Sequence, residues 1–467
     1  MEQILLSGPL PSAYTPGAPR PISIIPTPNL SPTMPYTLST KREARIMLPT
    51  SIANAHNDTR YSGLLCGYYV ANTNYYNIPP ADAHLNASRL RPVGVVSAQP
   101  FAEAVPAAMH RALNLAKAEI DTSLTPEERI RQRKAHRATP EEQAEARQHL
   151  FNLLREADPA GAICHDAVPA LLGFWDGDTL RLFQIDSLRE VIIEKFALEM
   201  DVFSRNVGIL ENAVMMKKGA LFIGCGSVGS LVAVELAKAG VGRFMLVDND
   251  IFGYHNICRH QCGVYDVGRY KTDALEERIL QINPYAEVRK FNCMIQEVDR
   301  GEIFSFCNPD TIVVGGADNR EGDLYACDFA LEIGMPFISI GCWERAFAGE
   351  VFYCLPQGHV TYKGFLDAVG YESGRVTQNR RFYTTEEDLA KVSFEPGISA
   401  DINFVTIVAV KMILDLLNRD TPGYVQRLLP SLTQYTLICN TNNPEVGGEQ
   451  AEIFSYPLQV TTSIYID

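Results

Sequence analysis

A glycine-rich turn between a buried strand and a helix constrains this chain more than any other feature. Residues 219–223 form a short apolar run, the sequence GCGSVG follows at 224–229, and apolar residues at helical spacing continue to about residue 238. A second apolar run at 243–247 completes a strand–helix–strand unit. Such a crossover joins parallel strands, whose sheet must be covered by helices on both faces. The sequence therefore predicts a Rossmann-like, doubly wound α/β domain.

The same turn predicts a nucleotide site. Gly224, Gly226 and Gly229 form a G-x-G-x-x-G pattern, in which backbone N–H groups and the dipole of the following helix accept phosphate. Asp248 ends the next strand, where a carboxylate can accept hydrogen bonds from a ribose. Because NAD and FAD sites share this pattern, an NAD-dependent oxidoreductase remains an alternative. The strand–helix context favours a nucleotide site over a purely structural turn.

Further elements extend the sheet downstream of this unit. We expect helices and apolar strands in alternation, followed by mixed strands that continue to the C-terminus. The expected helices are 271–283, 320–334 and about 400–417, and the expected strands are 311–315, 336–340 and 350–355. This order predicts a mostly parallel sheet.

The chain divides into three predicted parts. Nine prolines lie between Pro9 and Pro35, which fixes φ repeatedly and removes backbone donors, so residues 1–40 are expected to form an extended arm. Residues 41–190 are expected to form an α+β module, and residues 191–467 the nucleotide domain with its C-terminal crossover and strands.

Local signals place several elements in residues 41–190. Thr125 and Thr139 are each followed by proline and then by glutamate at the third position, which predicts two charged helices. Asp176-Gly177 separates two apolar runs and predicts a β-hairpin. The sequence SLRE at 187–190 has the form of a capping box and predicts a helix start. No catalytic constellation stands out before residue 190.

Four motifs accompany the glycine turn in a fixed order. They are FSRN at 203–206, DND at 248–250 with its loop HNICRH at 255–260, GRYK at 268–271 and ADNR at 317–320. Over about residues 195–420 the chain thereby resembles the ThiF/MoeB/ubiquitin-activating enzyme superfamily. The resemblance implies an E1-like enzyme that uses ATP and Mg²⁺ to adenylate the C-terminal glycine of a ubiquitin-like protein. The layout is also similar to bacterial activating enzymes of antiphage conjugation operons, of the kind called BilD. Residues 41–190 would then be an accessory module or a degenerate adenylation-like half.

The resemblance assigns roles to individual residues. A C-terminal carboxylate is already a nucleophile at neutral pH, so catalysis requires charge neutralisation and alignment rather than a general base. The implied catalytic residues are Arg205, Arg259, Lys271 and Asp318, of which Asp318 would also hold Mg²⁺. The implied nucleotide-binding residues are Gly224, Gly226, Gly229, Asp248, Asp250, Asn256 and Asn319. By analogy, Arg205 would reach the triphosphate of a neighbouring protomer, which implies a homodimer. His255 and His260 stand where the family has serine and glutamine.

The cysteines depart from the family pattern. The chain has no C-x-x-C pair, so a structural zinc site is not expected. The crossover region, about 358–395, has no cysteine for a thioester. Either the reaction stops at the acyl-adenylate, which passes to a conjugating-type partner or a sulfur donor, or a displaced Cys354 or Cys342 forms a thioester. The run His255, Cys258, His260, Cys262 is better explained as a nucleotide loop than as a metal site.

Three other functions remain open at this point. Within the same superfamily, the enzyme could adenylate a sulfur-carrier protein, a small molecule or a tRNA. From other classes come the NAD-dependent oxidoreductase and a non-enzymatic scaffold. The triphosphate-directed set of Arg259, Lys271 and Asp318 counts against both, because neither needs it.

The net charge and the number of cysteines restrict the binding partners and the cellular compartment that we expect. The formal net charge of −14 over 467 residues disfavours bulk binding to nucleic acid or to an anionic membrane. The first ten residues do not have the form of a signal peptide, and no stretch of about 18 apolar residues occurs. Eleven cysteines cannot all pair within one chain, which favours a reducing compartment. We therefore expect a soluble, cytoplasmic protein.

Overall fold

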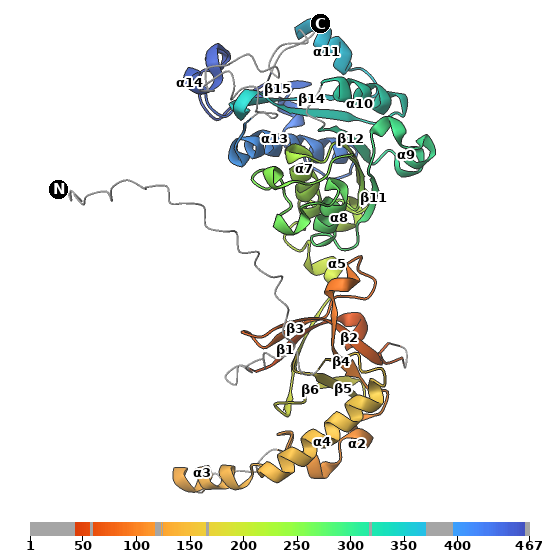
Figure 1. Ribbon diagram of the computed structural model, residues 1–467, viewed down its shortest axis with the longest axis vertical. Coiled ribbons are helices and arrows are strands. Elements are labelled where there is room, and N and C mark those ends of the chain that lie inside the picture. Colours follow the sequence, from red (N-terminus) through yellow and green to blue (C-terminus); the bar gives the residue numbers. More distant parts are fainter. Residues whose placement is uncertain are drawn as a thin grey trace, which may run out of the picture.

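Two eight-stranded sheets, each with its own helices, make up the computed structural model (Figure 1). The structure describes residues 43–56, 59–116, 123, 125–164, 168–316, 320–369 and 396–462. The predicted arm, residues 1–40, lies outside these ranges, as does most of the crossover region, 370–395. A short helix, α5 (Leu198–Asp201), lies between the two sheets (Figure 1).

The N-terminal sheet is mixed, with strand order β7-β6-β5-β4-β2-β3-β1-β8. Its strands are β1 (Arg45–Pro49), β2 (Gly63–Val70), β3 (Tyr75–Asn77), β4 (Arg91–Val96), β5 (Leu171–Asp176), β6 (Thr179–Gln184), β7 (Arg189–Glu190) and β8 (Ile192–Phe196). Helices α2 (Phe101–Ala104) and α4 (Pro140–Ala157) pack on one face, around Leu150, Phe174 and Phe183. A second core, which includes Tyr76 and Trp175, also belongs to this sheet. The structure thus confirms an α+β module before the nucleotide domain.

The local predictions for this module are confirmed with one exception. Gly177, with φ +60°, turns the chain between β5 and β6, and α3 (Pro126–Ala135) and α4 begin where the threonine signals placed them. The helix predicted from the capping box at 187–190 is wrong. Leu188 takes a left-handed conformation, with φ +54°, and the chain continues as strand β7 paired with β6.

Strand β8 extends the N-terminal sheet beyond the predicted boundary at residue 190. It pairs in parallel with β1, from Arg45 opposite Ile192 to Pro49 opposite Phe196. Pairing with a strand almost 150 residues earlier overrides the local helix signal, because the ladder satisfies the backbone groups of both strands. The N-terminal module therefore continues to Phe196.

The C-terminal sheet has the strand order β11-β10-β9-β12-β13-β14-β15-β16. Its strands are β9 (Gly219–Ile223), β10 (Arg243–Val247), β11 (Glu287–Phe291), β12 (Thr311–Gly315), β13 (Phe337–Cys342), β14 (Ala348–Cys354), β15 (Tyr435–Cys439) and β16 (Gln459–Thr462). The first five strands in this order are parallel and the last three are antiparallel additions. This agrees with the expected Rossmann-like, mostly parallel arrangement.

Helices cover both faces of the C-terminal sheet. One face packs against α7 (Ser227–Lys238), α8 (Lys271–Leu280) and α13 (Ser399–Asn418), with Phe222, Phe244 and Leu416 in its core. The other packs against α9 (Arg300–Phe306), α10 (Arg320–Glu332) and α11 (Tyr362–Val369). The strands and helices predicted between 219 and 418 are confirmed to within a few residues. Within the described ranges, no helix is long and apolar enough to span a membrane.

Candidate active site

A cleft of about 380 Å³ opens at the carboxyl ends of the parallel strands. Gly224 follows β9, Asp248 follows β10, Gly316 follows β12 and Cys342 ends β13, and all four line it. The chain runs from β9 through β10 to β11 on one side and then returns to place β12 on the other side of β9. The loops after β9 and β12 diverge at this reversal, which is where open parallel sheets bind ligands.

The glycine turn forms one end of the cleft. Gly224 has φ +100°, a conformation that a side chain would strain. A Cβ on Gly229 would lie 2.2 Å from the carbonyl oxygen of Gly224, so this glycine permits α7 to start against the turn. A Cβ on Gly226 would meet nothing within 4 Å. The space in front of Gly226 is open to a ligand, and the first N–H groups of the twelve-residue α7 begin there.

Asp248 holds the turn through its carboxylate. Its Oδ2 accepts from the N–H of Cys225 at 2.7 Å, and its Oδ1 accepts from the N–H of Asp250 at 2.8 Å. Each oxygen retains a second lone pair for a ribose hydroxyl. Sequence reasoning identified this residue but not its bond to the turn.

Lys271 is the first residue of α8 and is largely buried in the cleft wall. Its Nζ lies 2.5 Å from Oδ2 of Asp250, and its N–H donates to the carbonyl of Asp250 at 3.0 Å. The Asp250 side chain is 62% exposed, whereas that of Lys271 is 11% exposed. The ammonium is therefore held in place by a carboxylate that solvent or a ligand can also reach.

The loop after β10 contributes Asn256 and Arg259. Both line the cleft, and both are partly exposed. The Oδ1 of Asn256 accepts from the N–H of Gly253 at 2.8 Å and closes a turn within the loop. Arg259 and Lys271 thus bring two cationic side chains to the same cleft as the glycine turn.

His260 joins this loop to the glycine turn. Its Nδ1 accepts from the N–H of Cys262 at 3.1 Å, so Nε2 carries the hydrogen and donates to the carbonyl of Cys225 at 2.8 Å. Burial lowers the pKa of His260 from 6.5 to about 4, with a further contribution from Lys271. The neutral imidazole, which stands where the family has glutamine, thus bonds the glycine turn and its own loop.

The opposite wall is mainly apolar and comes from distant parts of the chain. It consists of Cys342 at the end of β13, Trp343 and Ala346 after it, Pro396 and Gly397 just before α13, and Ile402 in the first turn of α13. Arg345 and Ala346 both have φ +55°, a strained conformation for residues other than glycine. Trp343 donates from Nε1 to Oε2 of the buried Glu350 at 3.1 Å. Sequence reasoning missed this wall, apart from Cys342, and the only signals were the rare tryptophan and the Pro-Gly pair before the long helix.

The structure brings most of the predicted site residues together. Those lining the cleft are Gly224, Gly226, Asp248, Asp250, Asn256, Arg259 and Lys271. Gly229 lies behind the turn, and Arg205 is exposed outside this cleft. Asp318 and Asn319 lie outside the described residues, although Gly316, just before them, lines the cleft.

The two candidate thioester cysteines occupy different surroundings. Cys342 lines the cleft, whereas Cys354 is 1% exposed and its Sγ lies 3.4 Å from that of Cys327. The hydrogen bond with Cys327 and burial raise the pKa of the Cys354 thiol. Burial also raises the pKa of Cys225 well above its usual value. Cys225 and Cys354 therefore remain protonated thiols.

The described residues contain no group of three or more His, Cys, Asp or Glu side chains that could hold a metal ion. In the run from His255 to Cys262, backbone groups already engage both ring nitrogens of His260. Through His260, the loop is hydrogen-bonded to the carbonyl of Cys225 in the glycine turn.

Comparison with known proteins agrees with this geometry. The ThiF family model matches residues 205–444. A probable molybdopterin-synthase adenylyltransferase of Porphyra purpurea is 30% identical over 166 residues, which cover 35% of this chain and 42% of that protein. The sulfur carrier protein ThiS adenylyltransferase of Bacillus subtilis is 32% identical over 153 residues, which cover 32% and 44%. Ubiquitin-like modifier-activating enzyme 5 of Dictyostelium discoideum is 25% identical over 183 residues, which cover 37% and 48%.

The chain thus spans less than half the length of these curated relatives. Among solved structures, E. coli MccB with ATP matches at 18% identity and a TM-score of 0.39, over 54% of this chain and 65% of that chain. The ThiF match spans just over half of the chain and includes every residue that lines the cleft. The chain belongs to the ThiF family.

Proposed function

We propose that this protein adenylates the C-terminal carboxylate of a ubiquitin-like protein with ATP. The observation that carries the proposal is the composition of the cleft. One end combines an open glycine turn with Arg259 and Lys271, and the other end is an apolar wall. The first suits a triphosphate and the second suits a peptide tail.

Several residues of the cleft would each neutralise part of the negative charge on the two reactants. The attacking carboxylate and the α-phosphate are both anionic, so the barrier is electrostatic. Lys271, released from Asp250, and Arg259 would lie against phosphate oxygens, and the N–H groups at the start of α7 would bind others. Asp248 would hold the ribose. Asp318 would hold Mg²⁺, which supplies further positive charge to the phosphates when bound.

The apolar wall has a separate role. An acyl-adenylate is a mixed anhydride that water hydrolyses, and side chains such as Trp343 and Ile402 exclude water from it. The positive φ angles of Arg345 and Ala346 belong to the turn that carries Ala346 into the cleft lining. These apolar side chains would also contact an extended peptide tail.

The acyl group must then leave the cleft. We favour its direct transfer to a cysteine on a conjugating-type partner, because Cys354 is buried. Cys342 is the alternative acceptor within the chain, since it lines the cleft. Arg205, exposed outside this cleft, would complete the site of a second copy in a homodimer.

ATP–pyrophosphate exchange tests the proposal. We expect exchange that requires Mg²⁺ and a ubiquitin-like protein with a free C-terminal carboxylate, and none when that carboxylate is amidated. Exchange without any such protein would refute the assignment. Non-reducing electrophoresis of the same reaction separates the two fates of the acyl group: a thiol-sensitive band that is lost in Cys342→Ser would place a thioester on Cys342.

A sulfur-carrier protein is the second candidate substrate, because one of the similar proteins is by name a sulfur carrier protein adenylyltransferase. The exchange assay distinguishes the two candidate substrates. Each protein is added in a separate reaction, and only the true substrate should stimulate exchange. Membership of the ThiF family gives no support to an NAD-dependent oxidoreductase. Binding of NADH at micromolar concentration with no binding of ATP would reverse that preference.

A further inference from the structure

The N-terminal module contacts the nucleotide domain through the segment between β3 and β4. The N–H of His84 donates to the carbonyl of Pro284 at 2.7 Å, and its ring Nδ1 lies 3.2 Å from the carbonyl of Ala286. Five residues further along, Arg89 forms an ion pair with Glu277 of α8 at 2.5 Å. The contact therefore involves the helix that begins with Lys271.

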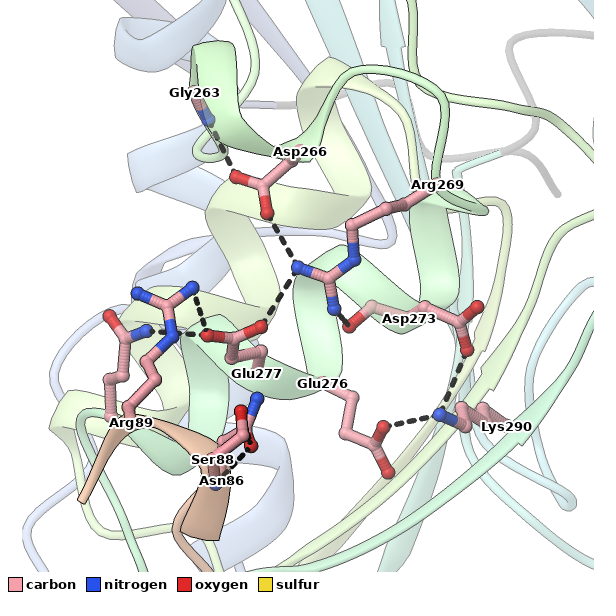
Figure 2. A network of polar contacts seen from close by, with 11 residues as sticks. Asn86, Ser88, Arg89, Gly263, Asp266, Arg269, Asp273, Glu276, Glu277 and Lys290 are labelled. Carbon is pink, nitrogen blue, oxygen red and sulfur yellow. Dashed lines mark hydrogen bonds and ion pairs between the residues drawn. The ribbon is translucent and has the colours of Figure 1, made fainter. Parts of the chain in front are cut away.

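The turn that carries Arg89 is itself held in place. Residues Ala87–Arg89 form one 3₁₀ turn, capped by Asn86. The Oδ1 of Asn86 accepts from the N–H of Ser88 at 3.0 Å and from its hydroxyl at 2.7 Å. Figure 2 shows this turn, in orange, beside α8. The guanidinium of Arg89 is thus presented to α8 by a locally ordered turn.

Glu277 connects Arg89 to Arg269, which lies in the loop just before Lys271. It is 13% exposed and binds Arg89 with one oxygen and Arg269 with the other, the second at 2.8 Å (Figure 2). Arg269 also binds Oδ1 of Asp266 at 2.8 Å and the carbonyl of Asp273 at 3.0 Å. A continuous chain of charged groups therefore connects the module to the loop just before Lys271.

This loop is bonded to the backbone just after Asp250, a residue that lines the cleft. The carbonyl of Arg269 accepts from the N–H of Phe252 at 2.8 Å, and the N–H of Gly268 donates to the carbonyl of Phe252 at 2.9 Å. Lys271 follows two residues after Arg269 and pairs with Asp250. Glu277 lies six residues beyond Lys271 on the same helix, about 9 Å along its axis. A shift of α8 at Glu277 is therefore a shift of Lys271.

A lysine of the domain itself holds the neighbouring flank of α8. Lys290 of β11 lies 2.8 Å from Asp273 and 2.5 Å from Glu276 (Figure 2). The helix is thus fixed by one cation from its own sheet and by another from the N-terminal module. Only the second depends on residues outside the ThiF match.

We infer that Arg89 is a positioning residue for the nucleotide site, and that through Glu277 and Arg269 the N-terminal module sets the affinity of the cleft for ATP. This inference rests on the proposed function, because it takes Lys271 to be a phosphate ligand. It assigns a role to a region in which sequence reasoning found no catalytic group.

Titration calorimetry of the full chain with ATP and Mg²⁺ tests the inference without turnover. We expect Arg89→Ala to weaken ATP binding roughly fivefold, in keeping with about 1 kcal/mol for a half-exposed ion pair within a network. In pyrophosphate exchange the same variant should raise the KM for ATP and leave kcat within about twofold. Arg91→Ala is the matched control, since Arg91 is an exposed arginine at the start of β4. It should bind ATP like the unaltered chain.

A double-mutant cycle tests the route. If Arg89 acts through Glu277, Arg89→Ala should have little further effect on ATP affinity in a Glu277→Gln background. Full additivity, or normal ATP affinity in Arg89→Ala, would overturn the inference while the proposed function stands. Failure of the unaltered chain to bind ATP would overturn both. Thermal melting of each variant checks that folding is retained.

Discussion

The two halves of the molecule are both built on eight-stranded sheets, but their strands end differently. In the C-terminal sheet, β9, β10, β12 and β13 are parallel, so their carboxyl ends meet at one edge and form the cleft. In the N-terminal sheet, parallel pairs such as β4–β5 and β1–β8 are mixed with antiparallel pairs such as β5–β6 and β6–β7, so the carboxyl ends of neighbouring strands do not all meet at one edge. The comparison teaches that strand direction, rather than sheet size, decides where loops converge into a site.

Polar groups have different roles in the N-terminal sheet and in the cleft of the C-terminal sheet. In the N-terminal sheet, the buried Gln184 donates to Asn74 at 3.0 Å and to the hydroxyl of Tyr76 at 2.8 Å, and that hydroxyl donates to the carbonyl of Pro169. Such a network stabilises one packing arrangement. In the cleft, by contrast, Asp250 and Arg259 remain partly open to solvent.

The largest expected effect is that of Lys271→Ala on catalysis. Removal of a cation that faces the triphosphate should reduce pyrophosphate exchange on the order of 10²-fold or more, as for other preorganised electrostatic groups. The exposed Asp250 left behind can be hydrated, so the fold should survive. Lys195→Ala is the control: Lys195 lies on β8 of the other sheet and donates to Asn54 at 2.7 Å, so exchange should be unchanged. Near-normal exchange in Lys271→Ala would remove the functional contrast between the sheets.

The next effect concerns stability in acid. The pKa of His260 is lowered to about 4, below its unfolded value of 6.5, so the unfolded state binds the proton first. Stability should therefore fall by about 3 kcal/mol as the pH decreases from 6.5 through 4. His260→Gln can donate to Cys225 and accept from Cys262 without titrating. Urea denaturation across this range should show a shallower pH dependence for His260→Gln, and parallel curves would contradict the assignment.

Two glycine substitutions separate the structural and ligand-facing sides of the turn. Gly229→Ala should destabilise the protein by about 1–3 kcal/mol, because the new methyl group collides with the carbonyl of Gly224. Gly226→Ala, whose methyl group meets open space in the protein, should unfold normally in urea but bind ATP more weakly. If both variants lose stability equally, the space before Gly226 is not a ligand cradle.

The smallest effect should come from Tyr76→Phe in the N-terminal sheet. Loss of the hydroxyl leaves Gln184 and the carbonyl of Pro169 without this partner, at a cost of about 1–2 kcal/mol in the free energy of unfolding. The KM for ATP and kcat should not change, since neither Tyr76 nor its partners Gln184 and Pro169 line the cleft. A change in either constant would show that the buried network of the module also acts on the site.

Much of this molecule is readable from short stretches of sequence. The alternation of strand and helix from residue 219 to 280, the turn at Asp176-Gly177 and the capped helix at Thr139 follow from local periodicity and backbone chemistry. The SLRE sequence at 187–190 shows the limit of such reasoning. Its capping signal was outweighed by strand pairing with β6 and β1.

The candidate site also has one part that the sequence predicted and another part that it did not. Glycines, acidic residues and cations at family spacing predicted the polar part of the cleft, including Asp248, Arg259 and Lys271. The apolar wall escaped notice because Trp343 and Ile402 are ordinary core types, and nothing near them in sequence shows that they face the glycine turn. The two backbone partners of His260 are at Cys225 and Cys262, and the contact with Cys225 spans 35 residues that local patterns do not connect.

The sequence by itself determined the local geometry: a glycine turn that opens a helix, an acidic residue after the next strand, and a lysine at the start of α8. These depend on φ, hydrogen bonding and side-chain periodicity within a few residues. The packing of the whole chain was needed to show that Ile402 lines the cleft and that Arg89, 188 residues before Glu277, pairs with the helix of Lys271. Contacts across such separations depend on how whole sheets and helices pack together, which no short stretch of sequence encodes.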